Sequence, residues 1–362
     1  MKKKVLLLSN MYPSADDPSY GTFVKITSDL LSEGGMDVQT IALCGRSGKL
    51  KTLLKYVLFW IKSFFAVCFG RYDLVYIHFY THVYFIIWLP ILLRRKKYVI
   101  NIHGGEVFVI SKHVKLLRDL SIPFLKHAAC IVVPSSYFKN VMINNFYITP
   151  EKFYVWPSGG VNDLFFSHKC PEKRNPKLKI GYVSRIDYNK GWDTLLNAFI
   201  EKNDDWENRF ELHFIGGGAE VNRFLSLANP YIKKGSLFYY GSLPHKEMVE
   251  NFKTFDVFVF PTMLNESLGL VGLEAMALGM PVVASHCGGI SEYLVDMYNG
   301  MFFEGGNADD MRKKIELFEK MSDEEFDLYK KRAFDTAGNF KASVVSVKLL
   351  SQFYTLMNEH QS

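Results

Sequence analysis

Residues 255–284 read FDVFVFPTMLNESLGLVGLEAMALGMPVVA, and this stretch decides the fold class. Residues 255–260 carry the apolar and β-branched side chains of a buried strand, whereas residues 268–278 carry apolar side chains at helical spacing. Residues 281–284 begin another apolar run. The stretch therefore predicts a strand that enters a helix through a short turn and is followed by a second strand, as in a parallel α/β sheet.

Two carboxylates, Glu266 and Glu274, flank the predicted start of this helix. A helix start presents unpaired N–H groups and the positive end of the helix dipole, which suit an anionic ligand such as a phosphate. A carboxylate next to a phosphate repels it unless the ligand also brings hydroxyl groups. The pair therefore indicates a ligand that joins phosphate to sugar, such as a nucleotide sugar. Spacing alone leaves an alternative open, in which Glu266 stabilises the helix dipole and Glu274 is a solvated helix residue.

The alternation of strands and helices extends over the chain, whose 362 residues predict two domains. We expect strands at residues 5–8, 38–43, 74–79, 98–103, 130–134, 153–157, 178–184, 210–215, 237–240, 255–260 and 281–284. A polar stretch at 167–176 is interpreted as a linker between two Rossmann-like domains. We place the first domain at 1–168 and the second at 169–343, with a closing helix within 344–362 that returns to the first domain.

Composition narrows the class of protein. A hydrophobic content of 48% excludes a disordered chain. The five cysteines form no C-x-x-C pair, which argues against a disulfide framework or a zinc site and favours a reducing cytosol. Residues 1–150 contain 19 Lys and Arg against 8 Asp and Glu, whereas the remaining residues contain 24 against 29. No nucleic-acid-binding signature accompanies the basic half, so no nucleic-acid partner is expected.

The basic charge of residues 1–150 suggests a membrane surface, rather than a nucleic acid, as the partner. The apolar and aromatic residues 53–65 are preceded or interrupted by lysines, Lys51, Lys55 and Lys62. Another apolar stretch is followed by the basic residues Arg94–Lys97. Basic residues beside Trp and Phe suit an anionic membrane surface, although a core helix with a solvated face explains residues 53–69 equally well. Residues 74–93 are long enough to span a bilayer but are interrupted by polar residues and a proline, and no secretory signal is expected at the N-terminus.

With both halves placed, the chain resembles the glycosyltransferase family 4 enzymes, which are retaining, metal-independent group 1 glycosyltransferases with the GT-B fold. The segments that carry the resemblance occur in order: GYVSRIDYNKG at 181–191, FIGGG at 214–218, YGSLP at 240–244, the E-x7-E segment at 266–274 running into AMALGMPVVA at 275–284, GGISE at 288–292 and NG at 299–300. The resemblance implies two Rossmann-like domains facing across a deep cleft, and a C-terminal helix that crosses back to the first domain.

The resemblance also assigns roles in the second half. Arg185 and Lys190 match the family's basic pair on the donor diphosphate, and Lys190 stands at the start of a helix expected at 192–199. Glu266 would hold hydroxyls of the transferred sugar, and Glu274 the ribose hydroxyls. The remaining donor-binding residues implied by the family are Gly217, Ser242 and Leu243 beside the base, and Ser267, Leu268, Gly269 and Leu270, whose N–H groups reach the diphosphate.

In the first half, Gly21 matches the family's glycine-rich donor loop, whose backbone approaches the phosphates. Many relatives have two adjacent glycines here, and this chain has one. His103 matches the family's cleft histidine at a strand end, and would bond the donor sugar or orient the acceptor. Ser135–Ser136 and Ser158–Val161 also match cleft segments, although turn and hinge roles explain them better.

No D-x-D metal motif occurs in the sequence. Charge on the leaving diphosphate would therefore be stabilised by Arg185, Lys190 and helix N-termini, without a metal ion or a cofactor. The resemblance implies a hexosyltransferase with a UDP- or GDP-linked sugar as co-substrate, and retention of anomeric configuration. In that mechanism Glu266 positions the sugar.

The acceptor expected from the basic, aromatic first half is a glycan or a polyprenyl-diphosphate-linked glycan, as in bacterial capsule or lipopolysaccharide synthesis. The protein is then cytoplasmic and peripheral at the inner face of the cell membrane. Two alternatives remain open, a nucleotide-sugar 2-epimerase and a non-catalytic GT-B subunit. A dinucleotide oxidoreductase is less consistent with the sequence, because no G-x-G-x-x-G follows the first strand.

Overall fold

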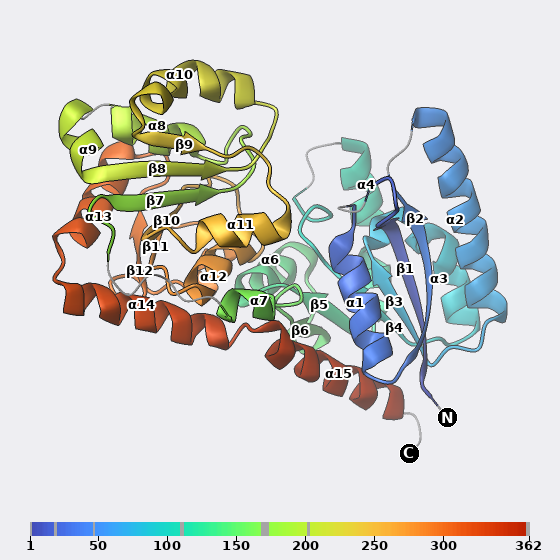
Figure 1. Cartoon of the computed structure of the whole chain (residues 1–362). Coiled ribbons are helices and arrows are strands. Elements are labelled where there is room, and N and C mark those ends of the chain that lie inside the picture. Colours follow the sequence, from blue (N-terminus) through green and yellow to red (C-terminus); the bar gives the residue numbers. More distant parts are fainter. Residues whose placement is uncertain are drawn as a thin grey trace. The chain divides into compact units, whose positions relative to one another are not determined.

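The computed structural model describes residues 2–17, 20–45, 48–108, 112–167, 174–200 and 203–359. The chain divides into two compact units: unit 1 comprises Met1–Gly159 and Val344–Ser362, and unit 2 comprises Gly160–Ser343. Each unit contains one six-stranded parallel sheet flanked by helices (Figure 1). The predicted fold class, two Rossmann-like α/β domains, is confirmed.

The boundary between the units lies at Gly159/Gly160 rather than at the expected 168/169. Val161 explains the difference, because it forms a β-bridge with Lys341, its N–H donates to the carbonyl of Phe340 at 2.8 Å, and its carbonyl accepts from Ala342 at 2.8 Å. Residues 160–167 are therefore tied to the second unit. Residues 168–173 of the predicted linker lie outside the described residues.

Unit 1 has the strand order β2-β1-β3-β4-β5-β6, with all neighbours parallel. Its strands are β1 (Lys4–Tyr12), β2 (Asp37–Cys44), β3 (Leu74–His78), β4 (Tyr98–Asn101), β5 (Cys130–Val133) and β6 (Phe153–Val155). Its helices are α1 (Thr22–Glu33), α2 (Lys49–Phe69), η1 (Tyr80–His82), α3 (Tyr84–Leu93), α4 (Lys112–Leu120), α5 (Ile122–His127), α6 (Ser136–Phe146), η2 (Pro150–Lys152) and most of α15 (Ala342–Asn358).

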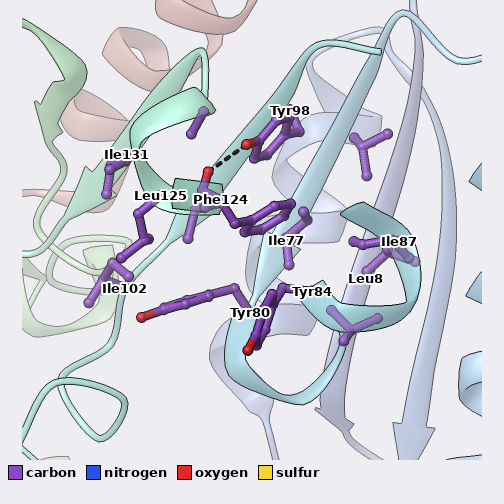
Figure 2. Packing of buried hydrophobic residues seen from close by; sticks show 14 of the residues in the cluster. Leu8, Ile77, Tyr80, Tyr84, Ile87, Tyr98, Ile102, Phe124, Leu125 and Ile131 are labelled. Carbon is purple, nitrogen blue, oxygen red and sulfur yellow. Dashed lines mark hydrogen bonds between the residues drawn. The ribbon is translucent and has the colours of Figure 1, made fainter. Parts of the chain in front are cut away.

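The inner strands of unit 1 are apolar on both faces, because helices cover both faces of a parallel sheet. On one face, the ring of Tyr98 stacks on that of Phe124 at 4.6 Å between centroids, and its hydroxyl donates to the Phe124 carbonyl. Figure 2 shows this pair beside Ile77, with Tyr80 and Tyr84 packed below. The hydrogen bond satisfies the polar end of a ring that is otherwise buried.

Helix α15 packs on the other face of this sheet. Leu349 and Phe353 are fully buried there, and the Phe353 ring meets Tyr76 edge-on at 4.8 Å. The Tyr354 hydroxyl donates to the carbonyl of Gly34 at 2.8 Å. The end of the chain therefore belongs to unit 1, although the preceding helix belongs to unit 2.

Unit 2 has the strand order β12-β11-β10-β7-β8-β9. Its strands are β7 (Leu178–Val183), β8 (Phe210–Ile215), β9 (Leu237–Tyr239), β10 (Val257–Phe260), β11 (Val282–Ser285) and β12 (Gly300–Phe303). Its helices are α7 (Asp163–Phe166), α8 (Trp192–Ile200), α9 (Asn203–Arg209), α10 (Val221–Lys234), α11 (His245–Phe252), α12 (Leu270–Ala277), η3 (Gly288–Glu292), α13 (Ala308–Lys320) and α14 (Asp323–Gly338). Strand β12 was not predicted, because it begins with a glycine, which shortens its apolar run to three residues.

The packing of α15 generates a stability prediction. Phe353→Ala should lower the free energy of unfolding by about 3–5 kcal/mol, because it removes a fully buried ring and leaves a cavity against the sheet. Val347→Ala on the same helix is the control, since Val347 is 65% exposed, and its effect should stay within about 0.5 kcal/mol. Chemical denaturation measures both variants, and equal effects would contradict the packing of α15 on this sheet.

Candidate functional site

The turn between β10 and α12 is shaped by glycines. Gly269 has φ +81°, and a Cβ there would lie 2.8 Å from the Phe260 ring, so α12 begins one residue later, at Leu270. Its start lies two residues after the predicted one, because Gly269 adopts the left-handed conformation that helices exclude. The backbone of the turn is also fixed from outside, since the N–H of Gly289 donates to the Glu266 carbonyl at 2.7 Å.

Lys190 and Glu266, predicted from separate motifs, form an ion pair at this turn. The Lys190 Nζ lies 2.7 Å from Glu266 Oε1, and the two side chains are only 14% and 19% exposed. The Thr262 hydroxyl donates to the same oxygen at 3.1 Å. A cation and a carboxylate are therefore held together, largely out of water, beside the start of α12.

The contact depends on a close approach of the loops that follow β7 and β10. Gly191 has φ +72°, and a Cβ on it would lie 1.9 Å from the Pro261 carbonyl oxygen, so only glycine fits. Asn189 lies two residues before Gly191 and Met263 two residues after Pro261, and the N–H of Met263 donates to the carbonyl of Asn189 at 2.9 Å. Because β7 and β10 are neighbours in the sheet, their loops meet at its carboxyl edge.

Arg185 lies on the same loop as Lys190 but takes a different partner. Its guanidinium lies 2.6 Å from Asp187 Oδ2, and its side chain is 72% exposed. The Tyr182 hydroxyl lies 2.9 Å from the Arg185 carbonyl and 3.4 Å from that of Lys190, which fixes the backbone of the loop. Arg185 and Lys190 thus share one loop, and their side chains pair with different carboxylates.

The predicted base-binding segments lie together at the ends of β8 and β9. The N–H of Gly216 donates to the Gly241 carbonyl at 2.8 Å, and a Cβ on Gly217 would lie 2.5 Å from Ser242 Oγ. The Gly217 carbonyl accepts from Ile186 at 2.8 Å, which joins this segment to the loop that carries Arg185. Leu243 packs, partly buried, against the apolar core of unit 2. Gly217 and Ser242 are therefore neighbours, and no side chain separates them.

Glu274 lies in the second turn of α12 and is half-buried. Burial raises the pKa of its carboxyl to about 7. Within the described parts of the chain, no residue donates a hydrogen bond to this carboxylate. Glu274 therefore keeps acceptor capacity that a ligand with hydroxyl groups can use.

In unit 1, the predicted residues Gly21 and His103 are linked through Phe23. Gly21 has φ +75° between β1 and α1, and a Cβ on it would lie 2.8 Å from the Met11 carbonyl carbon. Phe23 lies two residues after Gly21. Its ring packs on the ring of His103, with 4.5 Å between the ring centroids. The first turn of α1 and the end of β4 are thus in contact.

His103 is part of a buried polar cluster that the sequence did not reveal. Its Nε2 lies 2.9 Å from Nδ1 of His78, and burial lowers the pKa of His103 to about 3, so both rings are neutral at pH 7. Glu106 accepts the backbone N–H groups of His103 and Gly104 at 3.2 and 3.0 Å, and burial raises its pKa to about 7. One feature of the sequence could have revealed this cluster. The paired strands β3 and β4 each end in a polar residue.

The serine segments take the turn roles that the sequence favoured. The Ser135 hydroxyl accepts the N–H of Phe138 at 3.1 Å as the N-cap of α6. Ser158, Gly159 and Gly160 have positive φ values in a turn at the boundary between the units.

Two family models match the chain over most of its length. The model for glycosyl transferases group 1 matches residues 165–333, and the model for glycosyltransferase family 4 matches residues 37–160. The fold is of the GT-B type, as in the similar solved structures. The chain belongs to the group 1 glycosyltransferases.

Among individual proteins, the chain is 24% identical to an uncharacterized glycosyltransferase of Methanocaldococcus jannaschii, over 61% of this chain and 59% of that one. It is 24% identical to a Campylobacter jejuni N,N'-diacetylbacillosaminyl-diphospho-undecaprenol alpha-1,3-N-acetylgalactosaminyltransferase, over 68% of this chain and 59% of the relative. The matches thus span less than two thirds of either relative. The structure of Anabaena Alr3699/HepE in complex with UDP has a TM-score of 0.73 at 16% identity, over 98% of this chain and 100% of that chain.

The raised pKa of Glu274 predicts a pH-dependent stability. In the unfolded chain this carboxyl ionises near 4.5, so between about pH 4.5 and 7 the folded protein binds more protons and loses stability as the pH rises. Glu274→Gln removes this loss. We expect the variant without ligand to melt above the parent at pH 8 and level with it at pH 4.5. Thermal unfolding at the two pH values measures this, and a pH-independent difference would contradict it.

The Lys190–Glu266 pair predicts a measurable coupling. A double-mutant cycle with Lys190→Met and Glu266→Gln should give about 1–2 kcal/mol, because the pair is mostly shielded from water. The control is the pair Lys25–Asp29, whose side chains are 51% and 48% exposed, and which should give a clearly smaller coupling because water screens the two charges. A coupling for Lys190–Glu266 no larger than the control would show that the two charges do not depend on each other.

Proposed function

We propose that this chain is a retaining hexosyltransferase that moves a sugar from a UDP- or GDP-linked donor to a glycan or lipid-linked acceptor without a metal ion. The Lys190–Glu266 ion pair beside the start of α12 carries the proposal. A cation at a helix N-terminus suits the diphosphate of a nucleotide sugar, and a carboxylate suits its sugar hydroxyls. Family membership supports the same reaction class.

Donor binding then exchanges one set of contacts for another. Lys190 moves its charge from Glu266 to the diphosphate, which frees the Glu266 carboxylate to accept hydrogen bonds from the transferred sugar. The N–H groups of residues 268–270 reach the diphosphate at the positive end of α12. Glu274 accepts from the ribose. The base lies beside the Gly217–Ser242 contact, where glycine leaves the backbone of the loop without a side chain.

Arg185 acts on the same diphosphate in this proposal. Its exposed side chain is held by Asp187, and this exposed ion pair is weak enough to exchange for a phosphate. Two cations and a helix dipole then neutralise the charge that develops on the leaving group. The group they stabilise is the nucleoside diphosphate, released as the bond from its β-phosphate oxygen to the sugar breaks.

Retention follows if the acceptor hydroxyl attacks the same face from which the diphosphate departs. The new bond joins the acceptor oxygen to the anomeric carbon, and the acceptor's proton passes to the leaving phosphate oxygen. Glu266 positions the sugar in this scheme. His103, neutral because burial holds its pKa near 3, serves as a hydrogen-bonding group for the sugar or the acceptor rather than as a charge.

The proposed acceptor is a polyprenyl-diphosphate-linked glycan of bacterial surface polysaccharide synthesis, such as capsule or lipopolysaccharide, at the inner face of the cell membrane. The name of the Campylobacter relative specifies an undecaprenol-diphosphate-linked acceptor. The basic charge of residues 1–150 suits both that diphosphate and an anionic membrane. UDP as the donor nucleotide is supported by the HepE complex.

Arg185→Ala tests the assignment of the diphosphate site. Turnover should fall by about a hundredfold or more while the melting temperature hardly changes, because Arg185 is exposed and acts on the transition state. Nucleotide release is measured with UDP- and GDP-sugars and a short-chain polyprenyl-diphosphate-linked disaccharide, with and without excess EDTA. Arg223→Ala is the matched control, since Arg223 forms a similar exposed pair with Glu220, and it should leave turnover unchanged.

Each result has one interpretation. Undiminished turnover of the Arg185 variant would defeat the diphosphate assignment, and loss of turnover with EDTA would defeat metal independence. A protein that binds UDP or GDP in calorimetry but releases no nucleotide with any acceptor would be a non-catalytic GT-B subunit, the alternative that the single glycine at position 21 leaves open.

A further inference from the structure

Helix α2 buries little of its apolar surface. Of its side chains, all described, those of Phe59, Ser63 and Val67 are buried. Nine large apolar side chains are between 39% and 75% exposed: Leu50, Leu53, Leu54, Val57, Leu58, Ile61, Phe64, Phe65 and Phe69. Such a continuous apolar surface is unusual on a soluble monomer and marks an interaction site. Helix α2 contributes Phe59 and Val67 to the core of unit 1, as a core helix with a solvated face would, but its exposed face is apolar rather than polar.

Helix α3 extends this surface. The ring of Trp60 on α2 meets Phe85 on α3 edge-on at 5.4 Å, and its Nε1–H donates to the His82 carbonyl at 2.8 Å. Figure 1 shows α2 along the outside of unit 1 with α3 beside it. Four further side chains of α3 are between 45% and 73% exposed: Phe85, Leu89, Leu92 and Leu93. We call the exposed apolar residues of α2 and α3 the α2–α3 face.

The sheet excludes a membrane-spanning arrangement of α2. Its 21 residues are long and apolar enough to cross a bilayer. However, β2 and β3, which precede and follow α2, both pair with β1: Leu6 is aligned with Gln39 on one side and with Val75 on the other. A spanning helix would leave these two strands on opposite sides of the bilayer. If α2 contacts a membrane, it must lie along the surface.

The part of the sequence that carries α2 and α3 is rich in positive charge, although Asp37 and Glu106 stand directly outside it. Residues 38–105 contain ten Lys and Arg, and Asp73 is their single acidic residue. Lys49, Lys51 and Lys62 of α2 are exposed, and Arg94–Arg95 is exposed directly after α3. A second copy of the chain docked through the same face would bring these cations together, whereas anionic lipid headgroups would neutralise them.

A groove beside α2 offers room for a lipid chain. It has a volume of about 590 Å³ and lies between α2 and the edge strand β2. Its lining includes Ile41, Ile61, Phe65 and Ala66, with Lys62 as the cation. Gln39, Thr40 and Tyr72 also line the groove, so its polarity is mixed, and Lys62 is the feature that suits an anionic headgroup.

We propose that the α2–α3 face docks this protein on a bilayer containing anionic lipids, with α2 lying in the interface plane. Its leucine and phenylalanine side chains enter the acyl boundary, and its lysines with Arg94–Arg95 remain at the headgroups. The proposal gives a specific surface and orientation to the membrane location proposed above. It does not depend on the donor site of unit 2.

The test is co-sedimentation of the full chain with phosphatidylcholine vesicles, with and without phosphatidylglycerol, at low and high salt. The parent should bind the anionic vesicles. The triple variant Leu54→Ser, Leu58→Ser, Phe65→Ser should lose at least about tenfold in affinity at either salt concentration. The variant Lys51→Glu, Lys62→Glu should lose at least about tenfold at low salt and become nearly insensitive to salt. Sedimentation velocity without lipid follows the oligomeric state.

Matched controls separate this surface from general apolarity and charge. Leu227→Ser, Leu328→Ser, Val347→Ser changes residues that are 42%, 45% and 65% exposed on other helices, and Lys313→Glu, Lys320→Glu changes exposed lysines of α13. Both controls should bind vesicles like the parent. The stabilisation of each variant by UDP or GDP in thermal unfolding should match that of the parent, which shows that the donor site is intact even if docking is lost.

Three outcomes would overturn the proposal. They are equal binding to neutral and anionic vesicles, no binding to either, and a dimer of the parent that the triple variant dissolves while vesicle binding is absent. In the last case a second copy of the chain covers the α2–α3 face. Failure of nucleotide stabilisation in the parent, by contrast, would count against the donor site alone.

Discussion

The ion pair of Lys190 with Glu266 is the interaction on which the account depends. Its residues are 76 apart in the sequence and mostly shielded from water, so each charge keeps the other from being buried alone. Gly191 makes the pair possible because no other residue lets the β7 loop approach the Pro261 carbonyl. In the free protein the pair thus holds together a cation and a carboxylate that, in the proposed function, bind different parts of the nucleotide sugar.

Much of the fold followed from hydrophobic patterning. Strand β8 occupies the predicted residues 210–215, because a run of six residues, five of them buried, between two helices leaves little choice of register. The four-residue β12 gave no such signal. The boundary between the units was misplaced because it depends on Val161 pairing with Lys341, a contact between distant residues that local polarity does not report.

The candidate site was predictable as a set of residues but not as a set of contacts. Family motifs supplied Lys190 and Glu266, yet neither motif indicates that the two side chains meet. Arg185 was expected to act with Lys190, and the structure instead pairs it with Asp187, a partner two residues away that competes for its charge. The His78–His103 contact was missed because it depends on the alignment of β3 with β4.

Calorimetry of the bare nucleotide and the nucleotide sugar against two variants tests the central claim most directly. Whichever of UDP and GDP binds the parent should bind Lys190→Ala at least about tenfold more weakly, because the diphosphate loses a charge-assisted partner. Glu266→Gln should bind that nucleotide normally and lose only the extra affinity that the sugar provides. Unchanged nucleotide binding by the Lys190 variant, or equal losses of nucleotide and nucleotide sugar in the Glu266 variant, would contradict the account.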